Sequence, residues 1–199
     1  MNLPNKLTVS RIILSIIILV MLMIPWHALG VTWPEYTTFF KFKLDTPLSL
    51  KYIIAGILFV IASLTDRLDG AIARKRNMVT DLGKMLDAIA DKILVNGVLI
   101  ILAYDHIIPL VVPVVIITRD IITDTCKMVS GNKGKVVAAS WTGKIKTVFM
   151  MTGVSFAFFG NLPFELFHFA FADFCIIIAT ILSVVSGCQY YFNTRKLLK

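Results

Sequence analysis

The chain has 199 residues, of which 57% are hydrophobic and only 16% are charged, and its mean hydropathy is +0.82. Because soluble domains carry about a quarter of their residues as charged side chains, this composition excludes an ordinary soluble domain and predicts a polytopic membrane protein. The net charge of +8 is compatible with nucleic-acid binding, but it also follows from Lys and Arg held at the cytoplasmic face of a membrane.

The first apolar segment covers residues 7–24 and ends before Pro25. A cleaved signal peptide is the alternative interpretation of this segment. Residues 25–30 contain no convincing small-x-small cleavage site, and five further apolar segments follow. We therefore expect residues 7–24 to form part of the membrane domain.

Residues 26–49 contain Pro34, Pro47 and several aromatic side chains, a pattern typical of an interfacial loop with an aromatic belt. Apolar segments then follow at 50–65, 85–104, 107–126, 145–160 and 170–192. A spanning helix needs about 20 predominantly apolar residues. The sequence therefore predicts an all-α polytopic membrane protein with six transmembrane helices, forming a single domain over residues 1–199 with both termini on one side.

The distribution of cations predicts the orientation of these helices. Seventeen of the 20 Lys and Arg lie in the N-terminal segment, in regions 66–92 and 119–146 and in the C-terminal tail, the other three being Lys41, Lys43 and Lys51. By the positive-inside rule, both termini and both basic regions are cytoplasmic. This topology accounts for the basic charge, so we expect a multi-pass protein of the cell membrane that contacts lipid and binds no nucleic acid.

Four aspartates stand out at the ends of the second and third apolar segments. Asp66 and Asp69 are three residues apart, and Asp87 and Asp91 are four apart, so on helices each pair projects from one face. If the two helices face each other, four carboxylates converge and repel unless a divalent cation lies between them. Oxygen ligands favour Mg²⁺, Mn²⁺ or Ca²⁺, so the spacing predicts a site for one or two metal ions.

Glycine and arginine accompany these aspartates. Gly70 follows Asp69, and Gly83 precedes Asp87 by four residues, which leaves room for a ligand to approach the backbone. Arg74 lies about one helical turn beyond Gly70, where its guanidinium could bind a phosphate through two hydrogen bonds. The combination predicts a phosphorylated ligand. The alternative, ordinary salt bridges at helix ends, is disfavoured because ionisable clusters at membrane depth are functional by default.

Together these residues form the pattern D-x-x-D-G-x-x-A-R-x8-G-x3-D-x3-D, with its specified positions filled by Asp66, Asp69, Gly70, Ala73, Arg74, Gly83, Asp87 and Asp91. The pattern resembles the signature of the CDP-alcohol phosphotransferase family. Segments 2–11, 143–147 and 161–166 are similar to the bacterial members that make phosphatidylglycerophosphate, so the resemblance covers nearly the whole chain. It implies a six-helix membrane enzyme, commonly a homodimer, that condenses CDP-diacylglycerol with glycerol 3-phosphate and releases CMP.

The resemblance also implies a role for each residue of the signature. Two ions, Mg²⁺ or Mn²⁺, would be held by Asp66, Asp69, Asp87 and Asp91, and Asp91 would also act as the general base. The acceptor hydroxyl would attack the β-phosphoryl group, which carries diacylglycerol. Contacts with CDP-diacylglycerol are implied for Asn5, Thr8, Asp69, Gly70, Arg74, Thr80 and Gly83.

A phosphorylated acceptor needs basic side chains, and the candidates in the second basic region are Arg119, Lys135, Lys144 and Lys146. Lys144 and Lys146 are two residues apart, so on a helix they point about 200° apart and cannot both face one pocket. We expect Arg119 and Lys144 to contribute first, followed by Lys135 and Lys146. The alternative for this region is contact with anionic lipid headgroups.

Other activities stay open because the signature is specific for the CDP half of the reaction. Phosphatidylinositol phosphate synthesis is the nearest alternative, whereas the basic region 119–146 disfavours serine as acceptor. The chain has Ala88 and Asp120 where bacterial members of this type usually have Pro and Glu, but the signature is intact. A divalent-cation transporter is the alternative from another class. It is disfavoured because the acidic pairs lie at predicted cytoplasmic ends and the second half holds no copy of them.

Overall fold

The computed structural model describes residues 3–39, 42–75, 81–132 and 141–198. Most of these residues belong to six α-helices, which are α1 (Leu3–Met23), α2 (Leu50–Lys75), α3 (Asp81–Tyr104), α4 (Val111–Asn132), α5 (Trp141–Phe158) and α6 (Phe171–Leu198). Two short 3₁₀ helices are η1 (Trp26–Leu29) and η2 (Phe164–Phe167). The all-α prediction is therefore confirmed.

Each predicted apolar segment lies largely within one helix, but several helices extend beyond the apolar part. α2 continues to Lys75 and α3 begins at Asp81, so the aspartates of the signature lie on helices. Backbone hydrogen bonding continues past the first charged side chain, whereas a count of apolar residues stops there. α4 begins later than predicted, at Val111, because residues 105–110 form a turn in which His106 has a φ of 59°.

The segment expected to be an interfacial loop instead contains a β-hairpin. Strands β1 (Glu35–Phe39) and β2 (Phe42–Ser49) pair antiparallel, with Glu35 opposite Ser49 and an irregularity after Tyr36. Aromatic and β-branched residues fit a pleated strand well, and in a two-stranded hairpin both strands are edges that tolerate Pro47. The prediction of a loop is corrected on this point.

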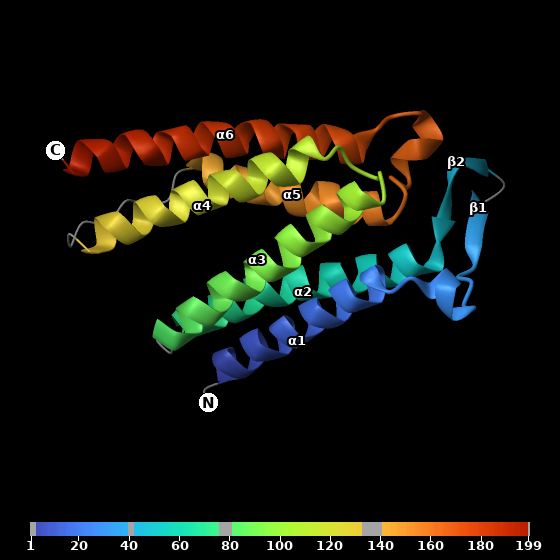
Figure 1. The fold of residues 1–199 in the computed structure, drawn as a ribbon, viewed down its shortest axis with the longest axis horizontal. Helices are drawn as coiled ribbons and strands as arrows, with labels where there is room; N and C mark the ends of the chain where they lie inside the picture. The colour runs from blue at the N-terminus through green and yellow to red at the C-terminus, as the bar shows by residue number, and fades with distance from the viewer. Residues whose placement is uncertain (1–2, 40–41, 76–80, 133–140, 199) are drawn as a thin grey trace.

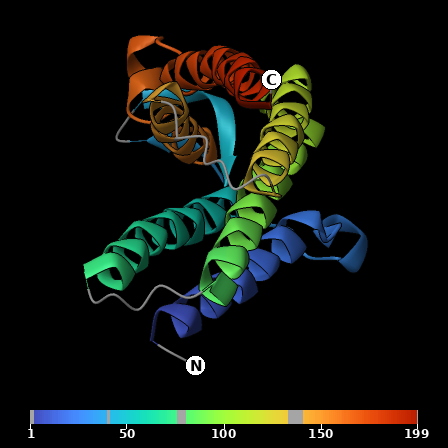
Figure 2. The same ribbon diagram turned by 90° about the vertical axis from the view of Figure 1, so that its left-hand side faces the viewer.

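The helices form two groups of three, α1–α3 and α4–α6, which diverge toward the end of the bundle where α1 begins and α6 ends (Figures 1 and 2). The closest packing is within each group, and the groups meet through α2 with α5 and through α3 with α4. The hairpin and η2 lie at the opposite end of the bundle (Figure 1).

α1 shows how the sequence determines this packing. Its buried face changes from polar to apolar along the helix, in the order Thr8, Arg11, Ser15, Ile18 and Leu22. These residues recur at intervals of three or four, so they share one face. The apolar half of that face packs on α2 and α3, while the polar half lies near the aspartates.

One helix in the described part of the chain is long and apolar enough by itself to cross a membrane, namely the stretch Phe171–Lys196 of α6. A shorter apolar stretch, Leu7–Met23, belongs to α1. The signature and the basic residues place charges in α2–α5, which reduces the apolar length of those helices. That all six helices span the bilayer stays a prediction.

Candidate active site

Three aspartates of the signature line one cavity where the two helix groups meet. The cavity has a volume of about 280 Å³ and receives Asp66 from α2 and Asp87 and Asp91 from α3. Its other lining residues, which come from α2, α3 and α5, are Ser63, Ala88, Thr147 and Met151. The structure thus brings together carboxylates from two helices, and it adds hydroxyl groups that the sequence did not single out.

A buried cation from α1 lies between two of these carboxylates. Arg11, whose side chain is only 2% exposed, forms ion pairs through Nη1 with Asp66 and through Nη2 with Asp87. Asp91 also interacts electrostatically with Arg11. One guanidinium therefore links α1, α2 and α3 at the cavity.

Sequence reasoning counted Arg11 only among the cytoplasmic cations and missed its place in the site. A signal was nevertheless present, because Arg11 lies in an apolar segment with Thr8 three residues before it and Ser15 four residues after it. Ser15 donates a hydrogen bond of 2.8 Å to the carbonyl of Arg11. A polar stripe on an otherwise apolar helix indicates a buried polar contact.

The donor set has the chemistry that a hard divalent cation requires. Among the described side chains, no three carboxylate, imidazole or thiol groups lie close enough together to hold a metal ion. Asp66 and Asp87 instead share the guanidinium of Arg11, which shows that this pair of carboxylates already attracts a cation. Their oxygens suit Mg²⁺ or Mn²⁺ once the guanidinium has left.

The residues predicted to contact CDP-diacylglycerol are placed in part. Thr8 lies buried on α1, one turn before Arg11, and Gly83 lies half-buried in the first turn of α3. The remaining predictions fall on side chains or residues outside the described part, which are Asn5 on α1, Asp69, Gly70 and Arg74 on α2, and Thr80.

A second charged cluster joins α4 to α5. Oδ1 of Asp120 lies 2.7 Å from Nη1 of Arg119 and 3.2 Å from Nζ of Lys146. Lys146 is buried, and it interacts electrostatically with Asp91 as well. Thr147, the next residue, lines the carboxylate cavity. Lys146 of the basic cluster and Thr147 of the acidic cavity are therefore adjacent residues of α5.

α6 completes the surroundings of Arg119. Nη2 of Arg119 donates a hydrogen bond of 2.6 Å to Oγ of Ser186, which is fully buried. At Gly187, an added Cβ would lie 2.8 Å from Cγ of Arg119, so only glycine leaves space for this arginine in its present place. Two adjacent residues of α6 thus determine where the guanidinium lies.

The structure does not bring all four predicted acceptor residues together. Arg119 and Lys146 meet at Asp120, whereas Lys144 is exposed and its Nζ lies 5.6 Å from the ring centre of Trp141. Lys135 lies outside the described residues. Lys144 and Lys146 therefore have different surroundings, and Lys146, not Lys144, shares Asp120 with Arg119.

Comparison with known proteins places this geometry in a family. The sequence model of the CDP-alcohol phosphatidyltransferases matches residues 1–185. The chain belongs to the CDP-alcohol phosphatidyltransferase family. Asp66, Asp87 and Asp91, which line the cavity, lie within the residues that the family model matches.

Two relatives of this CDP-alcohol phosphatidyltransferase carry the same name, CDP-diacylglycerol–glycerol-3-phosphate 3-phosphatidyltransferase. The protein from Bacillus subtilis (strain 168) is 40% identical over 200 residues, covering 100% of this chain and 97% of its own. The protein from Mycoplasma genitalium is 32% identical over 207 residues, covering 100% of this chain and 86% of its own.

A solved structure has the same fold. The apo form of the Mycobacterium tuberculosis phosphatidylinositol phosphate synthase superposes with a TM-score of 0.59, covering 95% of this chain and 87% of that one. The sequence identity is 17%, so this likeness establishes the helical arrangement alone.

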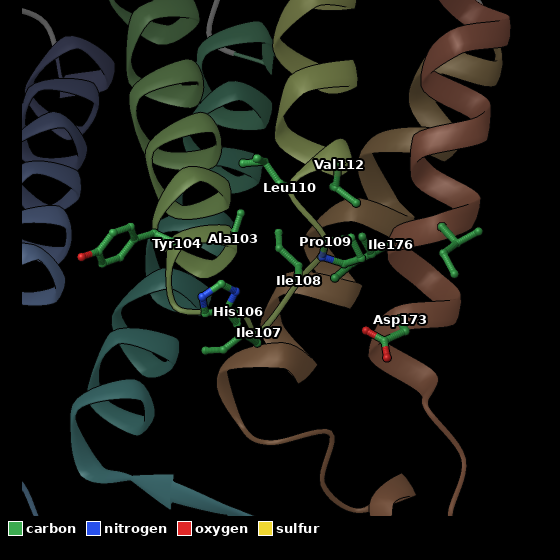
Figure 3. Close-up of a pocket in the computed structure, with 11 residues that line it drawn as sticks. Ala103, Tyr104, His106, Ile107, Ile108, Pro109, Leu110, Val112, Asp173 and Ile176 are labelled. Atoms are coloured by element: carbon green, nitrogen blue, oxygen red, sulfur yellow. The ribbon is translucent and has the colours of Figure 1, made fainter.

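The CDP-alcohol phosphatidyltransferase also has a larger cavity of about 810 Å³ at the other end of the bundle (Figure 3). Its walls come from the end of α3, the turn after it and the start of α6, and they are mostly apolar. Tyr104, His106 and Asp173 are the ionisable groups among its lining residues. No residue of the signature lines this cavity, so it is separate from the candidate active site.

Proposed function

We propose that the chain transfers the phosphatidyl group of CDP-diacylglycerol to glycerol 3-phosphate, giving phosphatidylglycerophosphate and CMP. Membership of the family and the names of two relatives that match the whole chain support this reaction. The structural observation that carries the proposal is the contact of two oppositely charged sites. A cavity of carboxylates suits the metal-bound pyrophosphate, and the basic pair of Arg119 and Lys146 beside it suits a phosphorylated acceptor.

The carboxylate cavity would serve the CDP half of the reaction. Two divalent ions, Mg²⁺ or Mn²⁺, bound by Asp66, Asp69, Asp87 and Asp91, would neutralise the pyrophosphate and the departing CMP. The proposed contacts with the nucleotide come from Thr8 on α1 and Gly83 on α3, together with Asn5, Gly70, Arg74 and Thr80. The signature residues thus bind and orient the activated lipid.

Asp91 is the proposed general base. The acceptor hydroxyl forms a bond to the β-phosphorus, the bond from that phosphorus to the oxygen of CMP breaks, and Asp91 takes the hydroxyl proton. A carboxylate is a weak base for an alcohol, so proton transfer must accompany P–O bond formation. The electrostatic interaction of Lys146 with Asp91 supports an acceptor phosphate bound on the same side of the cavity as this base.

Arg119 and Lys146 are the proposed ligands of the acceptor phosphate, with Lys135 and Lys144 as further candidates. A guanidinium and an ammonium that already share one carboxylate oxygen can exchange part of that contact for phosphate oxygens. A pocket of this charge favours phosphorylated acceptors over serine.

We further propose that the protein is a multi-pass enzyme of the cell membrane, with its active site facing the cytoplasm, and that it forms a homodimer. The concentration of Lys and Arg in the termini and in regions 66–92 and 119–146 supports this orientation. The start of α1, the end of α2, the start of α3 and the end of α6 lie at the same end of the bundle (Figure 1).

The test is CMP release by the purified full-length chain in detergent, with CDP-diacylglycerol and Mg²⁺ or Mn²⁺. Glycerol 3-phosphate, inositol phosphate, serine and no acceptor are compared. Release that depends on glycerol 3-phosphate supports the proposal. Release with inositol phosphate alone keeps the chemistry but changes the acceptor. Release with none of them contradicts the proposed reaction and directs attention to metal transport, measured as Mn²⁺ uptake into proteoliposomes.

A further inference from the structure

Arg11 has no role in the proposed function, yet it forms ion pairs with two of the proposed metal ligands. Nη1 and Nη2 of one guanidinium reach Asp66 on α2 and Asp87 on α3, and in each case the partner atom is Oδ1. The arginine is 2% exposed, whereas the carboxylates are 33% and 52% exposed. The cation is thus buried behind two carboxylates that line the cavity and remain partly exposed.

A divalent ion and the bridging guanidinium compete for the same oxygens. A metal ion bound to Asp66 and Asp87 needs lone pairs of these carboxylates at about 2.0–2.2 Å. The guanidinium donates a hydrogen bond from Nη2 to Oδ1 of Asp87 and forms an ion pair through Nη1 with Oδ1 of Asp66, so it occupies space at both oxygens, and its charge repels the incoming ion. Metal coordination through both Oδ1 atoms therefore requires Arg11 to give up at least one of its two ion pairs.

The bridge nevertheless stabilises the metal-free protein. Two carboxylates held close together at membrane depth repel, and a single buried guanidinium reduces that repulsion while it ties α1 to α2 and α3. Nε of Arg11 has no hydrogen-bond partner among the described residues, so the guanidinium is not fully held in this position. Such a cation can hold the site together and still be exchanged for another.

We propose that Arg11 is a built-in counter-cation of the metal site, which bridges Asp66 and Asp87 in the metal-free enzyme and is displaced by the first divalent ion. This inference rests on the proposed function, because it takes the two aspartates to be metal ligands. It implies that the affinity for metal is lower than the carboxylates alone would give. It also implies that loss of the bridge destabilises the metal-free protein.

The experiment is a titration of the full-length chain in detergent with Mn²⁺, in which free Mn²⁺ is measured by its electron paramagnetic resonance signal. Arg11→Met removes the charge with little change in volume, and it is expected to lower the Kd for Mn²⁺ about tenfold, the scale of a lost charged hydrogen bond. Arg11→Lys, which keeps the charge but lacks the two-pronged donor, is expected to lie between Arg11→Met and the wild type.

Lys146→Met is the matched control, because it removes another buried cation that interacts with Asp91 but does not bridge the carboxylates. We expect it to change the Kd much less than Arg11→Met. An equal effect would show that any nearby cation repels the metal and would overturn the role of the bridge. An unchanged or higher Kd in Arg11→Met would overturn the inference directly.

Thermal unfolding of the same variants gives a readout that does not depend on activity. Metal-free Arg11→Met is expected to unfold at a lower temperature than the wild type, and saturating Mn²⁺ is expected to recover more of its stability than it adds to the wild type. If Arg11→Met does not fold, Arg11→Lys carries the test, and it must then bind Mn²⁺ more tightly than the wild type.

Asp87→Asn separates this inference from the proposed function. If the wild type binds Mn²⁺ and Asp87→Asn does not, the metal site is real, and an unchanged Kd in Arg11→Met refutes only the role of Arg11. If Asp87→Asn binds Mn²⁺ as the wild type does, Asp87 is not a ligand and both proposals fail.

Discussion

Nζ of Lys146 lies 3.2 Å from Oδ1 of Asp120, across the contact between α5 and α4. The same oxygen lies 2.7 Å from Nη1 of Arg119, so one carboxylate holds two cations close together. The cluster has one positive charge in excess, and its two cations need little movement to meet a phosphate. Asp120 therefore keeps the basic pair in place while the acceptor is absent.

The first prediction concerns which lysine of α5 binds the acceptor. The sequence favours Lys144, whereas the structure places Lys146 beside Arg119 and Lys144 over Trp141. Lys146→Ala is expected to raise the KM for glycerol 3-phosphate about 10- to 100-fold, the scale of a lost charged hydrogen bond. Lys144→Ala is its matched control and should change that KM less than about twofold. Steady-state kinetics with each substrate varied in turn decides between them, and a larger effect of Lys144→Ala would move the pocket.

The second prediction compares two serines of α6, both of which are fully buried. Ser186 accepts the hydrogen bond of Arg119, whereas Oγ of Ser183 has no partner among the described residues. Ser186→Ala should raise the KM for glycerol 3-phosphate about three- to tenfold and leave the KM for CDP-diacylglycerol unchanged. Ser183→Ala should leave both values unchanged and should unfold at the same or a higher temperature, because it removes an unsatisfied buried hydroxyl. Equal kinetics in the two variants would contradict a positioning role for Ser186.

The third prediction compares two glycines that lie against other helices, only one of which contacts Arg119. A methyl group at Gly187 would meet Arg119, and one at Gly153 would meet Ile176 at 2.7 Å on the packing surface between α5 and α6. Gly187→Ala and Gly153→Ala should therefore both lower thermal stability through overpacking, by about 1–3 kcal/mol. Only Gly187→Ala should raise the KM for glycerol 3-phosphate. A similar rise in both variants would show that the effect comes from stability and not from Arg119.

The helices and part of the candidate active site could be predicted from the sequence alone. The apolar segments place the six helices, and the spacing of the aspartates indicates that carboxylates from two helices meet. Both are local properties, set by hydropathy and helical period. The divergence of Lys144 from Lys146 is local too, but which of them faces Arg119 depends on the rotation of α5 against α4, which no local pattern determines.

The bridge made by Arg11 is the other feature beyond the reach of the sequence. It depends on the side-by-side packing of α1, α2 and α3, whose contacts join residues up to 76 positions apart. The hairpin at 35–49 was missed for a different reason. Its alternating aromatic and β-branched residues favour strands, but Pro34 and Pro47 suggested a loop.

The fourth prediction tests the general base. Asp91→Asn removes the proposed proton acceptor at the cavity. The size of the side chain is kept, and so is a carbonyl oxygen that can ligate a metal ion. CMP release should fall at least about 100-fold, the lower range for loss of general base catalysis, while binding of CDP-diacylglycerol is retained in part. Binding is measured by titration of the inactive variant. Full activity of Asp91→Asn would exclude the assignment.

The fifth prediction concerns Asn161, which lies in the connection before α6 and hydrogen-bonds to the backbone near the start of that helix. Asn161 has a φ of 58°; its Nδ2 donates to the carbonyl of Phe169 at 2.7 Å, and its Oδ1 accepts from the backbone N–H of Ala172 at 2.9 Å. Asn161 is suited to this place because its short amide tolerates the left-handed region and satisfies two backbone groups near the start of α6. Asn161→Ala loses both hydrogen bonds and adds backbone strain, so it should cost about 2–4 kcal/mol of unfolding free energy.

Asn161→Gly is the control that separates these two causes. Glycine removes the strain but not the loss of the hydrogen bonds, so it should cost about 1 kcal/mol less than Asn161→Ala. Because Asn161 lies in the connection between α5 and α6 and does not line the carboxylate cavity, neither variant should change the KM for either substrate while the protein is folded. Unfolding in detergent, followed by circular dichroism, measures the order of the three proteins. Equal stability of Asn161→Ala and the wild type would show that the hydrogen bonds to Phe169 and Ala172 do not hold the start of α6.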